Sequence, residues 1–263
     1  KLGFIGTGNM ASAIMGGIIS KGVIPADEII GADLFAPGRE RVKEKFGIHV
    51  TADNNEVVEK ADVVLLSVKP QFYADVISGI KDKIRPDQIV ITIAPGKTLS
   101  WLAEQFGKDV KIVRCMPNTP AMVGEGMTAA CPNEHMTEEE IEYVKTLLSS
   151  FSLVEIVPEK LMDTVTAVSG SSPAYVFMFI EAMADAAVLD GMPRTQAYKF
   201  AAQAVLGSAK MVLDTGKHPG ELKDMVCSPA GTTIDAVRVL EECGFRGTII
   251  DAVQTCAEKS RSL

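Results

Sequence analysis

Short apolar runs recur through the first half of the chain and alternate with stretches of helical periodicity. Continuous runs such as 62–68 (DVVLLSV) are typical of parallel strands that are covered on both faces. Alternation of strands and helices predicts a doubly wound parallel sheet. The predicted strands are the run ending at Ile5 and 28–33, 62–68, 88–93 and 110–115, and the predicted helices are 10–20, 38–46, 73–80 and 100–106.

The pattern changes in the second half of the chain. Strands near 127–131 and 153–157, with a helix over 137–149 between them, extend one edge of the sheet in an undetermined direction. From Lys160 onward only helical patterns follow, and Gly and Pro separate them. The predicted helices are 173–189, 194–214, 232–242 and the stretch from 247 to the end. We therefore predict an α/β domain over 1–159 and an all-helical domain over 160–263.

The helices of this second domain are apolar over most of their circumference and rich in alanine and methionine. Such helices need burial on more than one side, which a single helical layer does not supply. We expect 173–189 to be a buried helix, because it carries Glu181 and Asp185 and is shorter than the ~20 apolar residues of a membrane span. We therefore predict that the helical domain is shared between subunits of a homo-oligomer. A compact monomeric bundle is the alternative.

Composition narrows the classes of partner. A formal net charge of −8 argues against nucleic acid or an anionic membrane. Five cysteines without CxxC spacing fit neither a disulfide framework nor a zinc site, and they suit a reducing compartment. We expect a cytoplasmic protein without a metal centre. The histidines His49, His135 and His218 lie in polar or turn contexts without a partnering pattern, so none is a strong catalytic candidate.

The first apolar run leads directly into the turn 6–11 (GTGNMA), which a helix follows. In such a strand–turn–helix unit the first glycine permits a tight turn, and the second lets the backbone approach a pyrophosphate. The N–H groups and the positive dipole end of the helix then favour the phosphates. The turn predicts a dinucleotide site in a Rossmann-type domain, whereas a purely structural turn is the alternative for the motif taken alone.

The second predicted strand ends at an acidic residue, Asp33. An acid at this position commonly binds the 2′-hydroxyl of the adenine ribose and favours NAD over NADP. Arg39 and Arg41 follow closely, and a guanidinium there could hold a 2′-phosphate instead. The pattern leaves the choice between NADH and NADPH open.

Three loops follow the carboxyl ends of later strands, namely 67–71 (SVKPQ), 93–96 (IAPG) and 116–120 (MPNTP). Loops at this edge of the sheet lie over a bound dinucleotide. Lys69 could reach a phosphate or a ribose, or it could be a surface lysine. The two prolines around Asn118 suit the floor of a nicotinamide or substrate pocket, or they could serve only to end the strand.

Two clusters rich in Ser, Gly and Pro each precede an apolar helix, at 169–173 (SGSSP) and 227–233 (CSPAGTT). A helix start presents free N–H groups, hydroxyls and a positive dipole end, which together suit a carboxylate. N-capping alone explains one such cluster. Two of them in an otherwise apolar domain favour a site for a small anion.

Six segments in order along the chain together resemble pyrroline-5-carboxylate reductase: 3–11 (GFIGTGNMA), 67–70 (SVKP), 114–120 (RCMPNTP), 169–175 (SGSSPAY), 218–224 (HPGELKD) and 228–233 (SPAGTT). The resemblance covers essentially the whole chain. It implies reduction of the small imino acid Δ1-pyrroline-5-carboxylate to L-proline with NADPH or NADH, the last step of proline biosynthesis. It also implies a dimer through the helical domain, which in many members is assembled into a larger ring.

The resemblance also implies roles for individual residues. Cofactor binding falls to Ile5, Gly6, Thr7, Gly8, Asn9, Met10, Asp33, Asn54, Ser67, Val68, Lys69, Pro70, Ala94 and Pro95, and the position of its loop adds Asn118 to this set. Substrate binding falls to Ser228, Gly231, Thr232 and Thr233, and the first Ser/Gly cluster adds Ser171 as a candidate. The hydroxyl of Thr233 matches the catalytic residue that is proposed to hydrogen-bond or protonate the imine nitrogen. A cyclic imine protonates far more readily than a ketone, so the scarcity of candidate histidines is compatible with this chemistry.

Three positions depart from the family pattern. Ser172 and Ala230 stand where glycine is common, and Asp33 stands where many members have a neutral residue. Two other functions remain as alternatives. A ketone reductase similar to β-hydroxyacid dehydrogenases would carry a lysine on the long interdomain helix, and 174–180 (AYVFMFI) contains none. A noncatalytic dinucleotide sensor would not need both helix-start clusters and Thr233.

Overall fold

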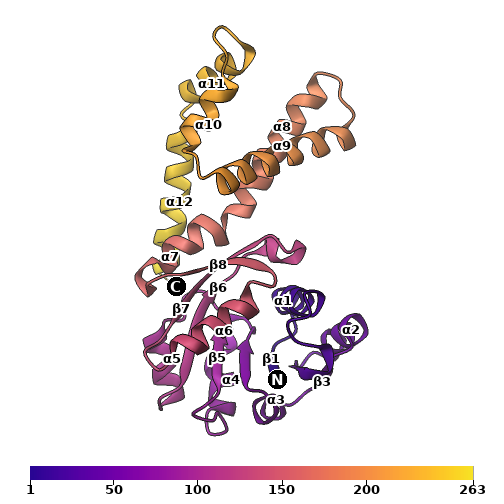
Figure 1. Cartoon of the computed structure of the whole chain (residues 1–263), viewed down its shortest axis with the longest axis vertical. Helices are drawn as coiled ribbons and strands as arrows, with labels where there is room; N and C mark the ends of the chain where they lie inside the picture. Colours follow the sequence, from indigo (N-terminus) through magenta and orange to yellow (C-terminus); the bar gives the residue numbers. More distant parts are fainter. Residues whose placement is uncertain (263) are drawn as a thin grey trace. The chain divides into compact units, whose positions relative to one another are not determined.

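The computed structural model describes residues 1–262 of the chain (Figure 1). They form two compact units: Lys1–Ser171 together with the stretch from Cys256 onward, and Ser172–Thr255. The first unit contains an eight-stranded sheet with helices, and the second contains only helices. The predicted fold class, a Rossmann-type sheet followed by an all-helical region, is therefore confirmed.

The sheet has the order β3-β2-β1-β4-β5-β6-β7-β8. Strands β1 to β6 are parallel, β7 runs antiparallel to β6, and β8 is parallel to β7. The apolar pattern does not predict β3, because this strand has only three residues and none of them is buried. The strands are β1 (Leu2–Ile5), β2 (Ile29–Ala32), β3 (His49–Thr51), β4 (Val63–Leu66), β5 (Ile89–Thr92), β6 (Lys111–Met116), β7 (Gly126–Pro132) and β8 (Ser152–Ile156).

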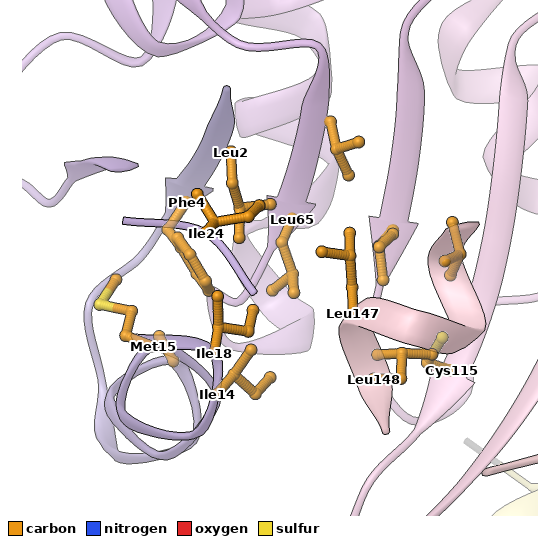
Figure 2. Close-up of a cluster of buried hydrophobic side chains, with 14 of the residues drawn as sticks. Leu2, Phe4, Ile14, Met15, Ile18, Ile24, Leu65, Cys115, Leu147 and Leu148 are labelled. Atoms are coloured by element: carbon orange, nitrogen blue, oxygen red, sulfur yellow. The ribbon is translucent and has the colours of Figure 1, made fainter. Parts of the chain in front are cut away.

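Helices on the two faces of the sheet bury two separate apolar clusters. Figure 2 shows one of them, in which Ile14 and Ile18 of α1 and Leu147 of α6 lie among side chains of the sheet such as Phe4 and Leu65. Helices α3, α4 and α5 contribute to the second cluster. Burial on both faces explains why the strands are continuous apolar runs. The helices are α1 (Asn9–Ser20), α2 (Ala36–Phe46), α3 (Asn54–Lys60), α4 (Tyr73–Ile80), α5 (Leu99–Phe106), α6 (Glu138–Leu148) and α7 (Met162–Val165).

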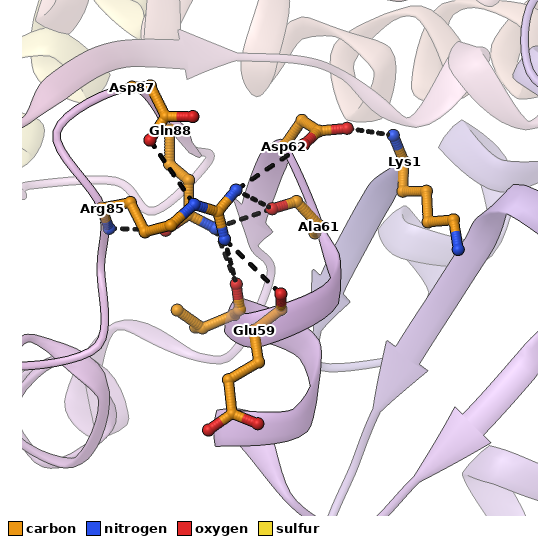
Figure 3. Close-up of polar contacts among 8 residues, drawn as sticks. Lys1, Glu59, Ala61, Asp62, Arg85, Asp87 and Gln88 are labelled. Atoms are coloured by element: carbon orange, nitrogen blue, oxygen red, sulfur yellow. Dashed lines mark hydrogen bonds and ion pairs between the residues drawn. The ribbon is translucent and has the colours of Figure 1, made fainter.

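A polar network joins the end of α3 to the segment that leads into β5 (Figure 3). The amide nitrogen of the fully buried Gln88 donates to the carbonyls of Val58 and Ala61, each at 2.7 Å. Arg85 donates to the same two carbonyls, at 3.3 and 3.1 Å. These contacts satisfy carbonyls at the end of a helix, which would otherwise be costly to bury. They also fix the edge of the sheet where β4 and β5 begin.

The second unit contains the helices α8 (Ser172–Leu189), α9 (Arg194–Thr215), α10 (Pro219–Val226), α11 (Thr232–Glu242) and the larger part of α12 (Phe245–Arg261). The sequence pattern does not predict helix α10, because His-Pro-Gly is typical of a break between helices. Pro219 instead occupies the first helical position, where its missing N–H costs nothing. The ring nitrogen Nδ1 of His218 accepts from the N–H of Gly220 at 3.0 Å and caps this helix.

The expectation that 173–189 is a buried helix is wrong within a single chain. Only Ala184 of α8 is buried, and large apolar side chains such as Phe177 and Met178 are exposed by 63% and 69%. On α9, Phe200 and Leu213 are exposed by 65% and 72%. Exposed apolar surface of this extent marks an interaction surface.

The helical stretch that contains α8 is also longer than the sequence pattern predicted. It runs from Glu159 to Leu189, because short 3₁₀, α and π turns precede α8, with a bend at Ser171 just before α8. By length and composition alone, this stretch could cross a membrane.

Candidate dinucleotide and substrate sites

The carboxyl ends of several parallel strands open onto one cavity of about 450 Å³ in the first unit. The strand order reverses between β1 and β4, and dinucleotides bind at this switch point in doubly wound sheets. Predicted site residues form much of its wall: Gly8, Asn9, Met10, Ser67, Val68, Lys69, Pro70, Ala94, Pro95, Asn118 and Ser171. The structure thus brings together the glycine turn, all three loops after the later strands and the first of the two Ser/Gly clusters.

The glycine turn is closely packed at Gly6 and open at Gly8. Gly6 has a φ of +97°, and a Cβ added there would lie 2.8 Å from the carbonyl oxygen of Ser67. The hydroxyl of Ser67 donates to the carbonyl of Gly6 at 2.7 Å, which ties the end of β1 to the end of β4. Gly8 has open space around it, and α1 begins there without a side-chain cap. The first N–H groups of α1 are therefore available to a pyrophosphate, so the turn fits the predicted cofactor.

The remaining predicted cofactor residues lie outside the lining of this cavity. Ile5, Gly6 and Thr7 are buried in the turn itself. Asp33 follows β2, and its carboxylate binds the turn through Thr7. Asn54 is partly buried at the first position of α3, and Asp53 caps that helix through the N–H of Asn55.

Two polar residues of the cavity, Lys69 and Asn118, differ in whether their side chains already bind other groups of the chain. Lys69 is exposed and forms no ion pair with the residues described, so its charge is free to meet an anion. Asn118 donates from its amide nitrogen to the carbonyl of Ser169 at 3.0 Å and accepts from the N–H of Met127 at 2.8 Å. Asn118 therefore joins the loop after β6 to the helical segment on the opposite wall and shapes the cavity floor.

A π-helix over Thr166–Gly170 forms part of the same wall, and the sequence pattern did not predict it. Single π turns inside longer helices are frequent at functional sites. This turn ends beside Ser171, whose hydroxyl oxygen accepts from the thiol of Cys256 at 3.2 Å. The hydroxyl proton of Ser171 remains available to a ligand.

Tyr73 is a second feature that sequence reasoning missed. Its hydroxyl donates to the carbonyl of Leu66 at 2.6 Å and accepts from the hydroxyl of Thr92 at 3.2 Å. It thereby joins the carboxyl ends of β4 and β5 directly beneath the loops that line the cavity. Tyr73 is fully buried, and burial raises the pKa of its hydroxyl from 10.0 to about 12. Nothing in the sequence separates this tyrosine from an ordinary core aromatic.

The raised pKa of Tyr73 predicts a loss of stability in alkali. The unfolded chain releases the phenolic proton near pH 10, whereas the folded chain retains it to about pH 12. The stabilisation is therefore complete below pH 10 and declines between these values, by up to ~2.7 kcal/mol for two pKa units. Chemical unfolding of the wild type and Tyr73→Phe across this range should show a smaller decline in the variant. Equal declines would exclude Tyr73 as the cause.

The second Ser/Gly cluster forms a tight turn before α11 in the second unit. The N–H of Gly231 donates to the carbonyl of Ser228 at 3.1 Å, and a Cβ on Gly231 would lie 2.3 Å from the hydroxyl of Ser228. Ala230 has a φ of 56°, which explains why glycine is common at this position. Gly231 begins α11 without a side-chain cap, so the N–H groups of Thr232 and Thr233 are open to an anion.

A larger hollow of about 650 Å³ does not qualify as the dinucleotide site. Its lining comes from the middle of α1, from α2 and from the segment 121–125, with Gly16 and Lys45 among its residues. No loop after β1, β4 or β5 reaches it, apart from Asn9 at the start of α1. A site for dinucleotide phosphates needs the strand ends and the helix start.

A doubly wound sheet, an uncapped glycine turn at its switch point and an acid after β2 define a dinucleotide-binding protein of the Rossmann type. Residues 159–263 match the family model of pyrroline-5-carboxylate reductase dimerisation, and residues 1–96 match that of NADP oxidoreductase, coenzyme F420-dependent. The pyrroline-5-carboxylate reductase of Escherichia coli (strain K12) is 53% identical over 100% of this chain and 98% of its own length. The chain belongs to the pyrroline-5-carboxylate reductase family.

Solved structures agree with this assignment. A pyrroline-5-carboxylate reductase from Coxiella burnetii superposes with a TM-score of 0.93 at 35% identity, over 99% of this chain and 97% of the other. The pyrroline carboxylate reductase of Plasmodium falciparum, solved with NADP bound, has a TM-score of 0.90 at 33% identity, over 100% and 97%.

Proposed function

We propose that this chain reduces Δ1-pyrroline-5-carboxylate to L-proline with NADH or NADPH, the last step of proline biosynthesis. The proposal is supported by relatives named pyrroline-5-carboxylate reductase that align along the whole chain. The observation that carries it is the presence of two uncapped helix starts of different character. One follows a glycine turn at the sheet's switch point, and the other follows a hydroxyl-bearing turn in the helical unit.

The first helix start, at Gly8, binds the cofactor. The N–H groups of α1 would hold the pyrophosphate, Lys69 would supply a positive charge, and the loops after β4, β5 and β6 would bind the nicotinamide half. When bound, the reduced nicotinamide supplies a hydride to the imine carbon. Ser67, Tyr73 and Asn118 act as positioning residues, because each joins two segments of the cavity wall by hydrogen bonds.

The second helix start, at Gly231, binds the substrate. The N–H groups at the start of α11 and the hydroxyls of Ser228 and Thr232 take the carboxylate. The hydroxyl of Thr233 forms no hydrogen bond with the described residues, so it is free to bind the ring nitrogen. Ser171 stays a separate substrate-binding candidate, on the evidence of its own Ser/Gly cluster. The reaction adds a hydride to carbon and a proton to nitrogen, and the protonated imine needs orientation more than a strong acid.

Ketone reduction is the competing chemistry, and α8 argues against it. A carbonyl accepts hydride poorly unless an acid donates a proton to its oxygen, which general acids such as lysine or histidine supply. Residues 172–189 contain neither lysine nor histidine. The imine reaction does not need such a group, so it fits this helix better.

Replacing Thr233 with alanine tests the substrate half of the proposal. We expect turnover to fall roughly 100-fold, because the ring would lose the hydrogen bond that orients it, while the dissociation constants for NADH and NADPH stay unchanged. Thr233→Ser keeps the hydroxyl and should retain most of the turnover. Thr146→Ala, an exposed helical threonine on α6, is the matched control. Wild-type turnover in Thr233→Ala would remove this residue from the reaction.

The proposed enzyme is a homo-oligomer. A dimer through the helical domain would cover the exposed apolar side chains of α8 and α9, and dimers can assemble into a larger ring. The family model that matches residues 159–263 carries dimerisation in its description. All five cysteines are free thiols, which supports a cytoplasmic location as part of the proposal.

A further inference from the structure

The carboxylate of Asp33 is held rigidly against the glycine turn. Its Oδ2 accepts from the main-chain N–H of Thr7 at 2.8 Å and from the hydroxyl of Thr7 at 2.9 Å. Its Oδ1 accepts from the N–H of Phe35 at 2.9 Å. Thr7 is fully buried, so the carboxylate cannot turn away without breaking the contacts that shape the turn. Each carboxylate oxygen has about two acceptor positions, and Oδ1 therefore keeps one for a ligand.

Two arginines near this carboxylate are already bound to the main chain. Arg39 donates to the carbonyl oxygen of Asp33 at 2.5 Å, and Arg41 donates to the carbonyl oxygen of Thr7 at 2.9 Å. Both guanidinium groups therefore brace the backbone of the same two residues. Gly38 leaves room for this arrangement, since a Cβ there would lie 3.3 Å from the hydroxyl of Thr7.

The two cofactors differ at this place only in the 2′ substituent of the adenine ribose. A ribose hydroxyl can donate a hydrogen bond to a fixed carboxylate. A 2′-phosphate carries a charge of about −1.5 to −2 at neutral pH, so it is largely deprotonated and is repelled by the carboxylate. The carboxylate cannot withdraw, and the arginines would have to leave their carbonyl partners to offset the repulsion. We propose that Asp33 makes this chain prefer NADH to NADPH, an inference that rests on the dinucleotide site of the proposed function.

A preference for NADH is opposite to the description of the family model that matches residues 1–96, which is that of an NADP oxidoreductase. The arginines then act as positioning residues for the turn, and they do not capture phosphate. Removing either arginine should weaken the binding of NADH and of NADPH equally. If an arginine held a 2′-phosphate, its removal would weaken NADPH alone.

Fragments of the two cofactors test the preference without any turnover. Isothermal titration of the full-length protein with ADP-ribose and with 2′-phospho-ADP-ribose should show binding of the first roughly tenfold tighter or more. Asp33→Asn should reduce this ratio by roughly tenfold, since the amide removes the charge and can donate to phosphate. Asp33→Ser gives a second neutral variant, and ADP-ribose binding reports whether the turn survives. Glu44→Gln removes one exposed charge from α2 and should leave the ratio unchanged.

The outcomes separate this inference from the proposed function. Equal or tighter binding of 2′-phospho-ADP-ribose by the wild type would overturn the preference and leave the reductase function intact. An unchanged ratio in both Asp33 variants would overturn the role of Asp33. Failure of the wild type to bind either fragment would overturn the dinucleotide site, and the preference with it. A specific loss of the phosphorylated fragment in Arg39→Gln or Arg41→Gln would also overturn the proposal.

Discussion

Replacing Gly6 with alanine should weaken dinucleotide binding roughly 100-fold or more. The new methyl group would lie 2.8 to 3.0 Å from main-chain atoms of Ser67 and Val68, which cannot move without separating β1 from β4. Alanine at a φ of +97° is strained as well. The turn would shift, and the N–H groups at the start of α1 would no longer point toward the pyrophosphate. Losing two charge-assisted hydrogen bonds, at ~1.5–3 kcal/mol each, weakens the affinity roughly 100-fold or more.

Gly22 provides the matched control for this change. It also has a positive φ, +66°, but a Cβ there has open space within 4 Å. Gly22→Ala should cost about 1 kcal/mol of stability through the same kind of backbone strain and leave cofactor binding intact. Titration of NADH and NADPH by fluorescence measures both variants. Wild-type affinity in Gly6→Ala would show that the turn does not bind the pyrophosphate.

Replacing Gly231 with alanine should damage the substrate site and spare the cofactor site. A Cβ at this position would lie 2.3 Å from the hydroxyl of Ser228 and 3.2 Å from its carbonyl oxygen. The hydroxyl would have to rotate out of the turn, and the hydrogen bond from the N–H of Gly231 would lengthen. A displacement of about 1 Å can cost roughly 100-fold in rate, so we expect kcat/KM for the imine to fall by that order.

The neighbouring residue separates this packing effect from a general effect on the turn. Ala230→Gly relieves the left-handed strain at a φ of 56° and should raise stability by about 1 kcal/mol with little change in kcat/KM. Steady-state kinetics and thermal unfolding of both variants make the comparison. If Gly231→Ala retained the wild-type kcat/KM, the turn would not hold the substrate.

The hydrophobic pattern predicted the parallel sheet because buried strands must be apolar on both faces. The same reasoning missed β3, whose residues His49 to Thr51 have little apolar character and lie at an edge. It also gave no direction for β7, which runs antiparallel to β6. Strand direction depends on the path of the connecting segment, and no periodicity encodes that path. Helix α10 was missed because Pro-Gly starts this helix as readily as it would end another.

Motifs located the cavity wall better than they located the groups that support it. Glycine turns and strand-end loops leave local signatures, and the structure collects residues such as Gly8, Lys69 and Pro95 around one cavity. Tyr73 and the π turn before Ser171 have no such signature. Their roles depend on contacts between segments that lie apart in the chain or on a single shifted hydrogen bond within a helix. The exposure of α8 likewise could be seen only in a folded chain.

The most direct measurement is the oxidation of reduced cofactor by the purified protein when Δ1-pyrroline-5-carboxylate is added. We expect imine-dependent oxidation of NADH with L-proline as product, and slower oxidation of NADPH at equal subsaturating concentration. A β-keto acid should give no oxidation. Binding of cofactor without turnover would identify a dinucleotide sensor, and oxidation by the β-keto acid alone would identify a ketone reductase. Either result would contradict the assignment as an imine reductase.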